Sequence, residues 1–207
     1  MSKLAERVRE GFRKRGTTSF LIAAVVLGVV VGLATAVLAI LIDGAETVTE
    51  SFGEWTSWGV WAFAVTIPIG MSISWWLNER LGPGIAGGGV SETMVGLSLF
   101  GGYRPTRLII PKMAATAATL GSGGSGGAEG PIAYIGASIG SSLARYGGFD
   151  HDRIRSLVAA GAGAGIGASF NAPIAGMLFA MEVILGSFAI RHLSAVVIAS
   201  VVAAVTA

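Results

Sequence analysis

The chain has 207 residues, of which 53% are hydrophobic and only 13% are charged, and its net charge is +2. Its mean hydropathy of +0.72 is too high for an ordinary soluble domain of this length. So small and scattered a charge does not favour nucleic acid as a partner. The chain has no cysteine, which excludes disulfides and thiolate metal sites. Together these values predict a protein of the lipid bilayer.

The first 19 residues are strongly basic. They hold six of the 14 basic residues, and Leu4, Val8 and Phe12 recur at every fourth position. This spacing puts the apolar side chains on one helical face, which is typical of a helix at a membrane surface. We therefore expect residues 1–19 to form a cytoplasmic basic amphipathic helix and residues 20–207 to form the membrane part.

Two long apolar segments follow. Residues 20–42 include no charged side chain, which is long enough for a membrane span. The next segment is acidic and holds no basic residue, so the lysine and arginine bias places the N-terminus in the cytoplasm and predicts an external loop with Asp43, Glu46, Glu50 and Glu54. A second span is predicted over residues 58–77, with tryptophans near both of its ends. The chain is thus expected to be a multi-pass integral membrane protein.

After residue 81 the apolar segments are shorter and are interrupted by glycine. Helices are predicted over residues 108–120, 131–146, 154–168, 172–188 and 193–207. Non-helical backbone at membrane depth is tolerated only where it is buried in protein or lines a polar cavity. Interrupted helices of this kind therefore favour a transport site.

The segment 121–131, GSGGSGGAEGP, places one carboxylate, Glu129, between glycines at a predicted helix start, with Pro131 in the first turn. The amide groups at a helix N-terminus attract anions, and Glu129 can itself occupy such a site as a tethered anion. The alternative is that Glu129 only caps the helix. Residues 82–89 form a second glycine cluster, which is either a second anion site or simply a turn.

The remaining polar residues allow several interpretations. Glu182 lies inside a helix predicted to be capped by Asn171 and is a proton relay, an ion-pair partner or a snorkelling end residue. His151 and His192 are isolated in charged turns, which argues against a metal site. No serine, histidine and aspartate are placed to act together, so the chain is not expected to be an enzyme. The glycines are assigned to close helix packing at positions 28, 32, 161, 163, 165 and 167.

With these motifs the chain resembles the CLC family of chloride channels and chloride/proton antiporters. The segment GAEGP (127–131) is similar to the family's G(R/K)EGP, SFNAPIAGMLFAMEVI (169–184) to its NAP motif, and residues 87–92 stand at the place of its GSGIPE. The resemblance implies a homodimer with one anion path per subunit, chloride as substrate and no cofactor. It also implies that Glu129 is the gate, that Glu182 belongs to a possible proton pathway, and that the anion is bound by Gly87, Gly88, Gly89, Ala128, Glu129 and Gly130.

The chain also departs from the family pattern. Gly88 replaces the serine that holds the central ion, and Ala128 replaces a basic residue beside the gate. Val183 stands where many antiporters have a glutamate and channels have valine. Only the first of the two inverted repeats of the family is recognised, because the GxFxP motif of the second is not found.

We therefore predict an all-α polytopic membrane protein with the broken, re-entrant helices of a CLC-type first repeat, in a truncated form. Its predicted function is channel-like transport of chloride or a similar small anion, gated by Glu129. One alternative is a non-transporting half that only dimerises with or regulates a complete subunit. Another is chloride/proton antiport. A cation transporter is disfavoured because Glu129 and Glu182 are the only suitable carboxylates. The expected partners are the anion, protons, lipid, and a second copy or a separate second half.

Overall fold

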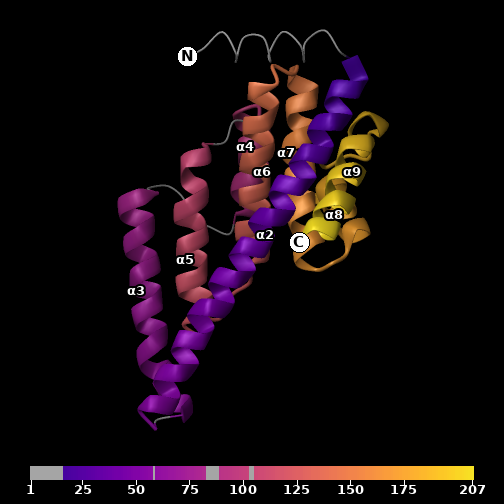
Figure 1. The fold of residues 1–207 in the computed structure, drawn as a ribbon. Coiled ribbons are helices and arrows are strands. Elements are labelled where there is room, and N and C mark those ends of the chain that lie inside the picture. The colour runs from indigo at the N-terminus through magenta and orange to yellow at the C-terminus, as the bar shows by residue number, and fades with distance from the viewer. Residues whose placement is uncertain (1–15, 58, 83–88, 103–104) are drawn as a thin grey trace, which may run out of the picture.

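The computed structural model describes residues 16–57, 59–82, 89–102 and 105–207. These residues form helices and turns without a strand, as the sequence predicts (Figure 1). Its α-helices are α2 (Gly16–Trp55), α3 (Phe63–Leu81), α4 (Val90–Leu99), α5 (Ile109–Gly121), α6 (Glu129–Tyr146), α7 (His151–Ser169), α8 (Pro173–Phe179) and α9 (Ile190–Thr206). Three short turns accompany them, namely η1 (Gly59–Ala62), η2 (Thr106–Leu108) and the π-helical η3 (Ala180–Ile184). Of the predicted basic helix over 1–19, residues 1–15 lie outside the described residues, and residues 16–19 begin α2.

The first helix is longer than predicted. With 40 residues and 1.5 Å per residue, α2 is about 60 Å long, twice the hydrocarbon thickness of about 30 Å. It runs obliquely past the other helices toward the start of α3 (Figure 1). The predicted loop with Asp43, Glu46, Glu50 and Glu54 is therefore wrong, because these residues lie in α2.

Contacts with the end of α5 explain this continuation of α2. The hydroxyl of Thr49 donates a hydrogen bond to the carbonyl oxygen of Gly121 over 2.7 Å. The Cα of Gly121 packs so closely on Ala45 that a side chain there would collide with it. No proline interrupts the acidic segment, and one helical glycine such as Gly44 costs only about 1 kcal/mol. Tertiary packing thus outweighs the polar sequence that suggested a loop.

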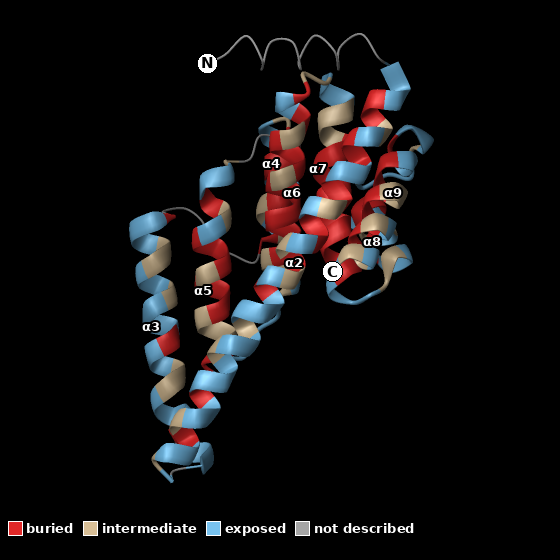
Figure 2. Ribbon diagram, viewed as in Figure 1, coloured by how far each residue is buried: buried red, intermediate tan, exposed pale blue. Residues whose placement is uncertain are grey.

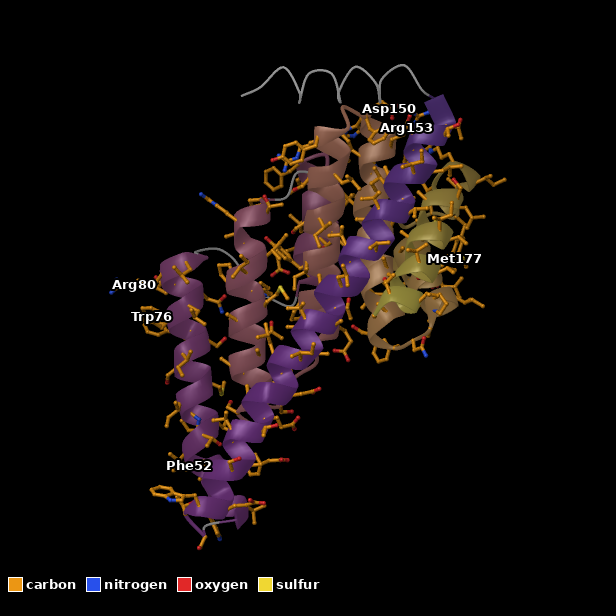
Figure 3. The ribbon with its side chains drawn as sticks, viewed as in Figure 1. Phe52, Trp76, Arg80, Asp150, Arg153 and Met177 are labelled. Carbon is orange, nitrogen blue, oxygen red and sulfur yellow. The ribbon has the colours of Figure 1, made fainter. Side chains whose placement is uncertain are left out.

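Two of the described helical segments are long and apolar enough to cross a membrane, Gly16–Trp55 and Gly59–Leu81. The second corresponds to the span predicted over 58–77, and it comprises η1 and α3. Figure 3 shows Phe52 near the end where α2 and α3 meet, and Trp76 and Arg80 near the far end of α3. Aromatic side chains at both ends are typical of a segment whose ends meet the two membrane interfaces.

The core is centred on α7, which packs on α6, α8, α9 and α2. Figure 2 shows the buried residues concentrated in α6 and α7. Gly136 of α6 and Gly161 of α7 touch backbone to backbone, since a Cβ on either would collide with the carbonyl oxygen of the other. A Cβ on Gly28 or on Gly32 of α2 would lie within 2.8 Å of a carbonyl oxygen of α9. The predicted role of Gly28, Gly32 and Gly161 in close helix packing is confirmed.

The helix predicted over 172–188 is shorter than expected. It begins at Pro173 and ends with the π-helical turn at Ile184. Asn171 does not cap it, because its φ of 49° is left-handed and Ala172 takes the cap position without a side-chain hydrogen bond. Instead, the left-handed residue closes α7, whose Gly167 carbonyl accepts from the Ala172 amide over 2.8 Å.

His192 is not an isolated residue in a charged turn, as the sequence suggested. Its side chain is buried between α7 and α9 with 2% exposure. The Nε of Arg191 donates to its Nε2 over 3.1 Å, so the ring hydrogen lies on Nδ1, 2.6 Å from the Ser156 hydroxyl. Ser156 in turn donates to the carbonyl oxygen of Asp152 over 2.9 Å. This network requires a neutral imidazole.

We expect acidification to weaken the packing of α7 on α9. Burial and then Arg191 lower the pKa of His192 below its usual 6.5, with Arg155 acting in the same direction and Asp152 opposing them. The unfolded chain therefore binds the proton first, and stability falls as the pH drops below about 6.5. Thermal unfolding in detergent between pH 7.5 and 5 should show this loss. His192→Gln should reduce it, whereas the exposed His151→Gln should behave like the parent. Equal pH dependence in all three proteins would contradict this assignment.

Candidate functional site

The N-termini of α4 and α6 meet in the structure. Gly89, which precedes α4, has a φ of 84°, and a Cβ there would collide with the carbonyl oxygen of Gly130 and lie 3.2 Å from the nitrogen of Pro131. A hydrogen bond holds Gly89 in this position: the fully buried Thr93 donates its hydroxyl to the Gly89 carbonyl over 2.7 Å. Gly89 and Gly130, which are 41 positions apart in sequence, are thus brought together.

Neither helix start has a side-chain cap among the described residues. The cap positions are Gly89 for α4 and Ala128 for α6, and neither cap side chain accepts a hydrogen bond from its helix. The first amide groups of a helix have no partner within the helix, and their dipoles act together as about half a positive charge. Two such ends side by side form a suitable environment for a small anion. Of the predicted anion-binding residues, Gly89, Ala128, Glu129 and Gly130 lie here, whereas Gly87 and Gly88 fall outside the described residues.

Glu129 is the first residue of α6. Its side chain is exposed and folds back over Gly127, where a Cβ would collide with the carboxylate. A side chain at position 127 would thus exclude this rotamer of Glu129. The structure therefore places a negative charge beside the two uncapped helix starts on a side chain that is not buried by the described residues.

Gly89→Ala tests the contact between the helix starts. We expect it to weaken anion binding or flux at least about tenfold, because the new Cβ collides with Gly130 and pushes the two N-termini apart. Gly186→Ala is the matched control, since Gly186 has a similar φ of 64° and nothing within 4 Å of its Cβ position. Left-handed backbone strain of about 1–2 kcal/mol affects both variants. Equal losses in the two would show that strain alone is responsible.

A buried lysine of α5 lies close to α6. Lys112 of α5 is 6% exposed, and its Nζ lies 5.9 Å from the ring centroid of Tyr134 in α6. Its charge interacts with that of Glu92 in the first turn of α4. The sequence analysis did not select Lys112 or Glu92. The available signal was that Lys112 is the only charged residue of α5.

Lys112 also lines a polar cavity of about 210 Å³ between α3, α5 and the segment before α6. Ser74, Asn78, Thr116 and Gly127 share this lining. The Oδ1 of Asn78 and the Oε2 of Glu92 are buried, and neither has a hydrogen-bond partner among the described residues. The cavity thus reaches the segment over which the Glu129 carboxylate folds.

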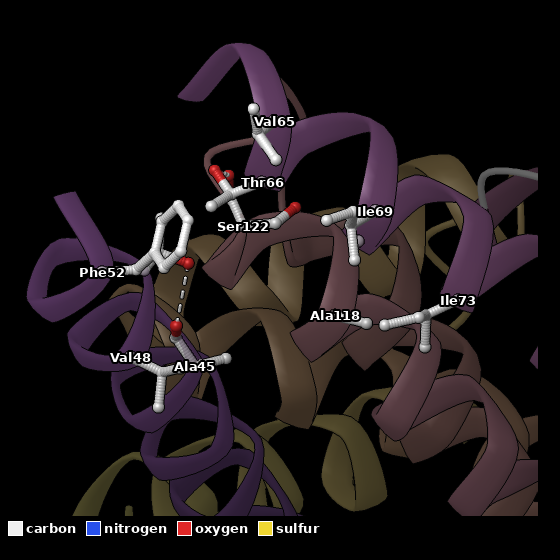
Figure 4. Close-up of a pocket in the computed structure, with 11 residues that line it drawn as sticks. Ala45, Val48, Phe52, Val65, Thr66, Ile69, Ile73, Ala118 and Ser122 are labelled. Atoms are coloured by element: carbon white, nitrogen blue, oxygen red, sulfur yellow. Dashed lines mark hydrogen bonds between the residues drawn. The ribbon is translucent and has the colours of Figure 1, made fainter. Parts of the chain in front are cut away.

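A second cavity, of about 420 Å³, is apolar (Figure 4). Side chains of α2, α3 and α5 line it, among them Val48, Phe52 and Ile69. Its Thr66 hydroxyl is already engaged with the carbonyl oxygen of Ser122 over 3.1 Å. Because this cavity presents no charged side chain, it is unsuited to an anion.

Glu182 lies away from the position expected for it. It belongs to the π-helical turn η3, near the end of its helix rather than well inside it, and it is exposed. Val183 next to it is exposed as well. The early end of the helix explains both facts, because Gly186 turns the chain at a φ of 64°.

A family model and the curated relatives identify the same protein family for this chain. The family model described as voltage gated chloride channel matches residues 69–207. The H(+)/Cl(−) exchange transporter ClcA of Vibrio vulnificus is 31% identical over 204 residues, which cover 93% of this chain and 43% of that protein. ClcA of Vibrio cholerae is 29% identical over 217 residues, 98% of this chain and 45% of that protein. This chain spans less than half the length of these relatives.

Two solved structures have the same fold as this chain. The crystal structure of a slow cyanobacterial Cl−/H+ antiporter superposes with a TM-score of 0.78 and 26% identity, over 90% of this chain and 45% of that one. A eukaryotic CLC transporter superposes with a TM-score of 0.79 at 21% identity, over 90% of this chain and 37% of that one, which shows a shared fold. The predicted fold is confirmed, and so is the expectation that the chain is not an enzyme. The chain belongs to the voltage gated chloride channel (CLC) family of membrane proteins and corresponds to about half of its relatives.

Proposed function

We propose that this chain forms half of a membrane transport pathway for chloride or a similar small anion. The observation that carries the proposal is the meeting of two uncapped helix starts at Gly89 and Gly130. An anion leaving water must recover its hydration energy from such amide groups. The family, and the relatives named as H(+)/Cl(−) exchange transporters, support an anion as the substrate.

Glu129 is the proposed gate. Two unit charges about 4 Å apart repel each other by about 4 kcal/mol at an effective dielectric constant near 20. An ionised Glu129 therefore competes with an anion for the helix starts, and its protonation ends the competition. The anion is bound by backbone amides of the segments 87–89 and 128–130. This makes transport depend on pH at a single carboxylate.

Exchange of chloride for protons is the second candidate mechanism. The relatives named as exchangers favour it, and Glu182 would then belong to the proton pathway. Val183 next to Glu182 favours the channel-like mechanism, because it supplies no second carboxylate at that turn. Chloride flux driven by a proton gradient would separate the two mechanisms.

The proposed topology follows from the charge distribution. Residues 1–19 form the basic cytoplasmic segment, and the protein assembles as a homodimer or with a partner that supplies the second half. Protease accessibility of residues 1–15 in oriented vesicles tests the orientation, with cleavage expected only from the cytoplasmic side.

A non-transporting half is the competing function. It is tested by chloride efflux from vesicles that contain this chain alone, and from vesicles that contain it together with a second CLC-type half. We expect efflux in the second preparation. If neither preparation exceeds protein-free vesicles, the chain regulates or dimerises rather than transports.

A further inference from the structure

A polar cavity of about 610 Å³ lies where α2, α7 and α9 begin. All three helices start at this end of the molecule (Figure 1). The volume lies within the range of about 300–1,000 Å³ that is typical of small-molecule sites. Side chains of all three helices line the cavity, among them Thr17, Phe20, Arg153, Ser156, Arg191 and Ser194. None of its lining residues belongs to the paired starts of α4 and α6, so it is a separate site.

We propose that this cavity binds the phosphate group of an anionic phospholipid such as phosphatidylglycerol, with Arg191 as the main ligand and Arg153 beside it. The proposal goes beyond the anion path, because it assigns a lipid headgroup site to another part of the protein. This is the end at which residues 1–15, with six basic side chains, precede α2. In the proposed topology it is the cytoplasmic end.

Arg191 carries a charge that no described carboxylate neutralises. Its Nε donates to Nε2 of His192 over 3.1 Å, and it forms no ion pair within the described part of the chain. His192 is 2% exposed and is itself held by Ser156, so the guanidinium is anchored on a buried neutral ring. Its two terminal amino groups donate to no described residue. Such a planar pair of donors suits two oxygens of one phosphate group.

The surrounding groups leave the cavity positive. Arg153 lines it as well, and the charge of Arg155 acts on the ring of His192. Of the two lining carboxylates, Asp150 is already engaged, because it pairs with Arg153 over 3.7 Å and caps α7. Asp152 is exposed. The start of α9 has no side-chain cap and adds about half a positive charge. Three guanidinium groups and this helix start thus outweigh two carboxylates.

Arg153 joins the start of α7 to the start of α2. Its Nη1 donates to the carbonyl oxygen of Gly16 over 3.3 Å, and its Cζ lies 5.5 Å from the ring centroid of Phe20. Figure 3 shows Arg153 beside the first turns of α2. Phe20 also packs edge-on against Phe149, with 5.9 Å between the ring centroids. Guanidinium and aromatic side chains gathered in this way are typical of the membrane interface.

The cavity lies at the boundary between charged and apolar surface, which favours a lipid over a soluble phosphate. The apolar segment of α2 begins at Phe20, and Ile22, Val25 and Val26 just beyond it are exposed. Ile190 of α9 is exposed as well. Basic pockets between membrane helices on the cytoplasmic side are known to bind anionic headgroups. A phospholipid held here by its phosphate can lay its acyl chains on the exposed apolar side chains.

A metal ion does not suit this cavity. The described residues include no group of histidine and carboxylate side chains that could hold one. Both ring nitrogens of His192 are engaged, with Ser156 and with Arg191. The arginines would also repel a cation. An anion is therefore the ligand that fits.

Short-chain lipids test the class of ligand. The purified chain in a neutral detergent is titrated by calorimetry with dihexanoyl phosphatidylglycerol, dihexanoyl phosphatidylcholine and glycerophosphate. We expect phosphatidylglycerol to bind at least about fivefold more tightly than phosphatidylcholine, whose trimethylammonium group the arginines repel. It should bind at least about tenfold more tightly than glycerophosphate, which has no acyl chains. Equal affinity for the two lipids, or glycerophosphate binding as tightly as phosphatidylglycerol, overturns the proposal.

Arg191→Gln tests the main ligand. It should weaken the binding of dihexanoyl phosphatidylglycerol at least about fivefold, because the phosphate loses its charged partner. Arg80→Gln is the matched control, since it removes the same charge from an exposed side chain near the far end of α3 (Figure 3). The control should keep its affinity within about twofold of the parent. Unchanged affinity in Arg191→Gln, or equal losses in both variants, overturns the proposal.

Ser194→Asp tests the same site without removing a packed side chain. Ser194 is exposed and lines the cavity, and an acid near a helix start does not weaken the helix. The variant should therefore melt like the parent in the absence of lipid. It should bind dihexanoyl phosphatidylglycerol at least about fivefold more weakly, because its carboxylate repels the phosphate.

These two variants keep the proposal falsifiable. If Arg191→Gln does not fold, Ser194→Asp decides, since unchanged lipid affinity there overturns the proposal. Binding in detergent requires no transport, so its failure would leave the proposed function untouched. Conversely, a chain that fails to transport chloride can still bind the lipid.

Discussion

Replacement of Glu129 with glutamine is expected to give anion flux that does not respond to pH. If Glu129 is the gate, its ionised form competes with the anion for the helix starts, so flux should rise as the pH falls and the carboxylate is neutralised. Glutamine has nearly the same shape but no charge at any pH. Its flux at pH 7.5 should therefore match the flux that the parent reaches only in acid.

The measurement is chloride efflux from vesicles across pH 4.5 to 7.5. Glu50→Gln is the control, because Glu50 is an exposed carboxylate of α2 that lies elsewhere in the fold and its removal should preserve the pH response. If Glu129→Gln retains the response of the parent, another group is the gate.

Among the substitutions considered, Gly136→Val is expected to lower the free energy of unfolding most. A Cβ on Gly136 collides with the carbonyl oxygen of Gly161, so α6 and α7 must separate at the centre of the core. Forcing extra volume into a packed core costs about 2–3 kcal/mol or more. In a chain of this length that corresponds to a fall in the unfolding midpoint of about 5–10 °C.

Thermal unfolding in detergent measures this effect. Gly44→Val is the matched control, since Gly44 is also helical but has nothing within 4 Å of its Cβ position. The control should melt close to the parent. A Gly136→Val protein that melts with the parent would contradict the close contact of α6 with α7.

The sequence predicted the parts of the fold that depend on local patterns. Glycine interrupts each apolar segment, so the helices α5 and α6 begin and end within two residues of their predicted bounds. The spacing of Gly161 to Gly167 indicated close packing, and these positions contact α6, α8 and α9. In both cases the residue type itself indicates the geometry, because glycine has no side chain and lets two backbones approach closely.

The sequence predictions were wrong where contacts between residues far apart in the chain determine the local structure. The acidic end of α2 was read as a loop, but the bond from Thr49 to Gly121 comes from residues 72 positions apart. His192 was read as isolated, although Ser156, 36 positions away, faces its ring. Lys112 was not selected for the same reason, since Glu92 and Tyr134, with which it interacts, belong to two other helices.

The candidate site was predicted in part. Glu129 and the glycine clusters were selected because the free amides at a helix start attract anions, and a carboxylate there is itself an anion. That Gly89 and Gly130 touch could not be derived from either segment alone, because it requires the packing of α4 on α6.

Chloride efflux with and without an imposed proton gradient tests the central claim most directly. The claim is that the paired starts of α4 and α6 bind an anion in competition with one titratable carboxylate. Vesicles that contain this chain with a second half should release chloride, and acidification should accelerate the release. Release no faster than from protein-free vesicles, or at a rate that does not change with pH, would contradict the claim.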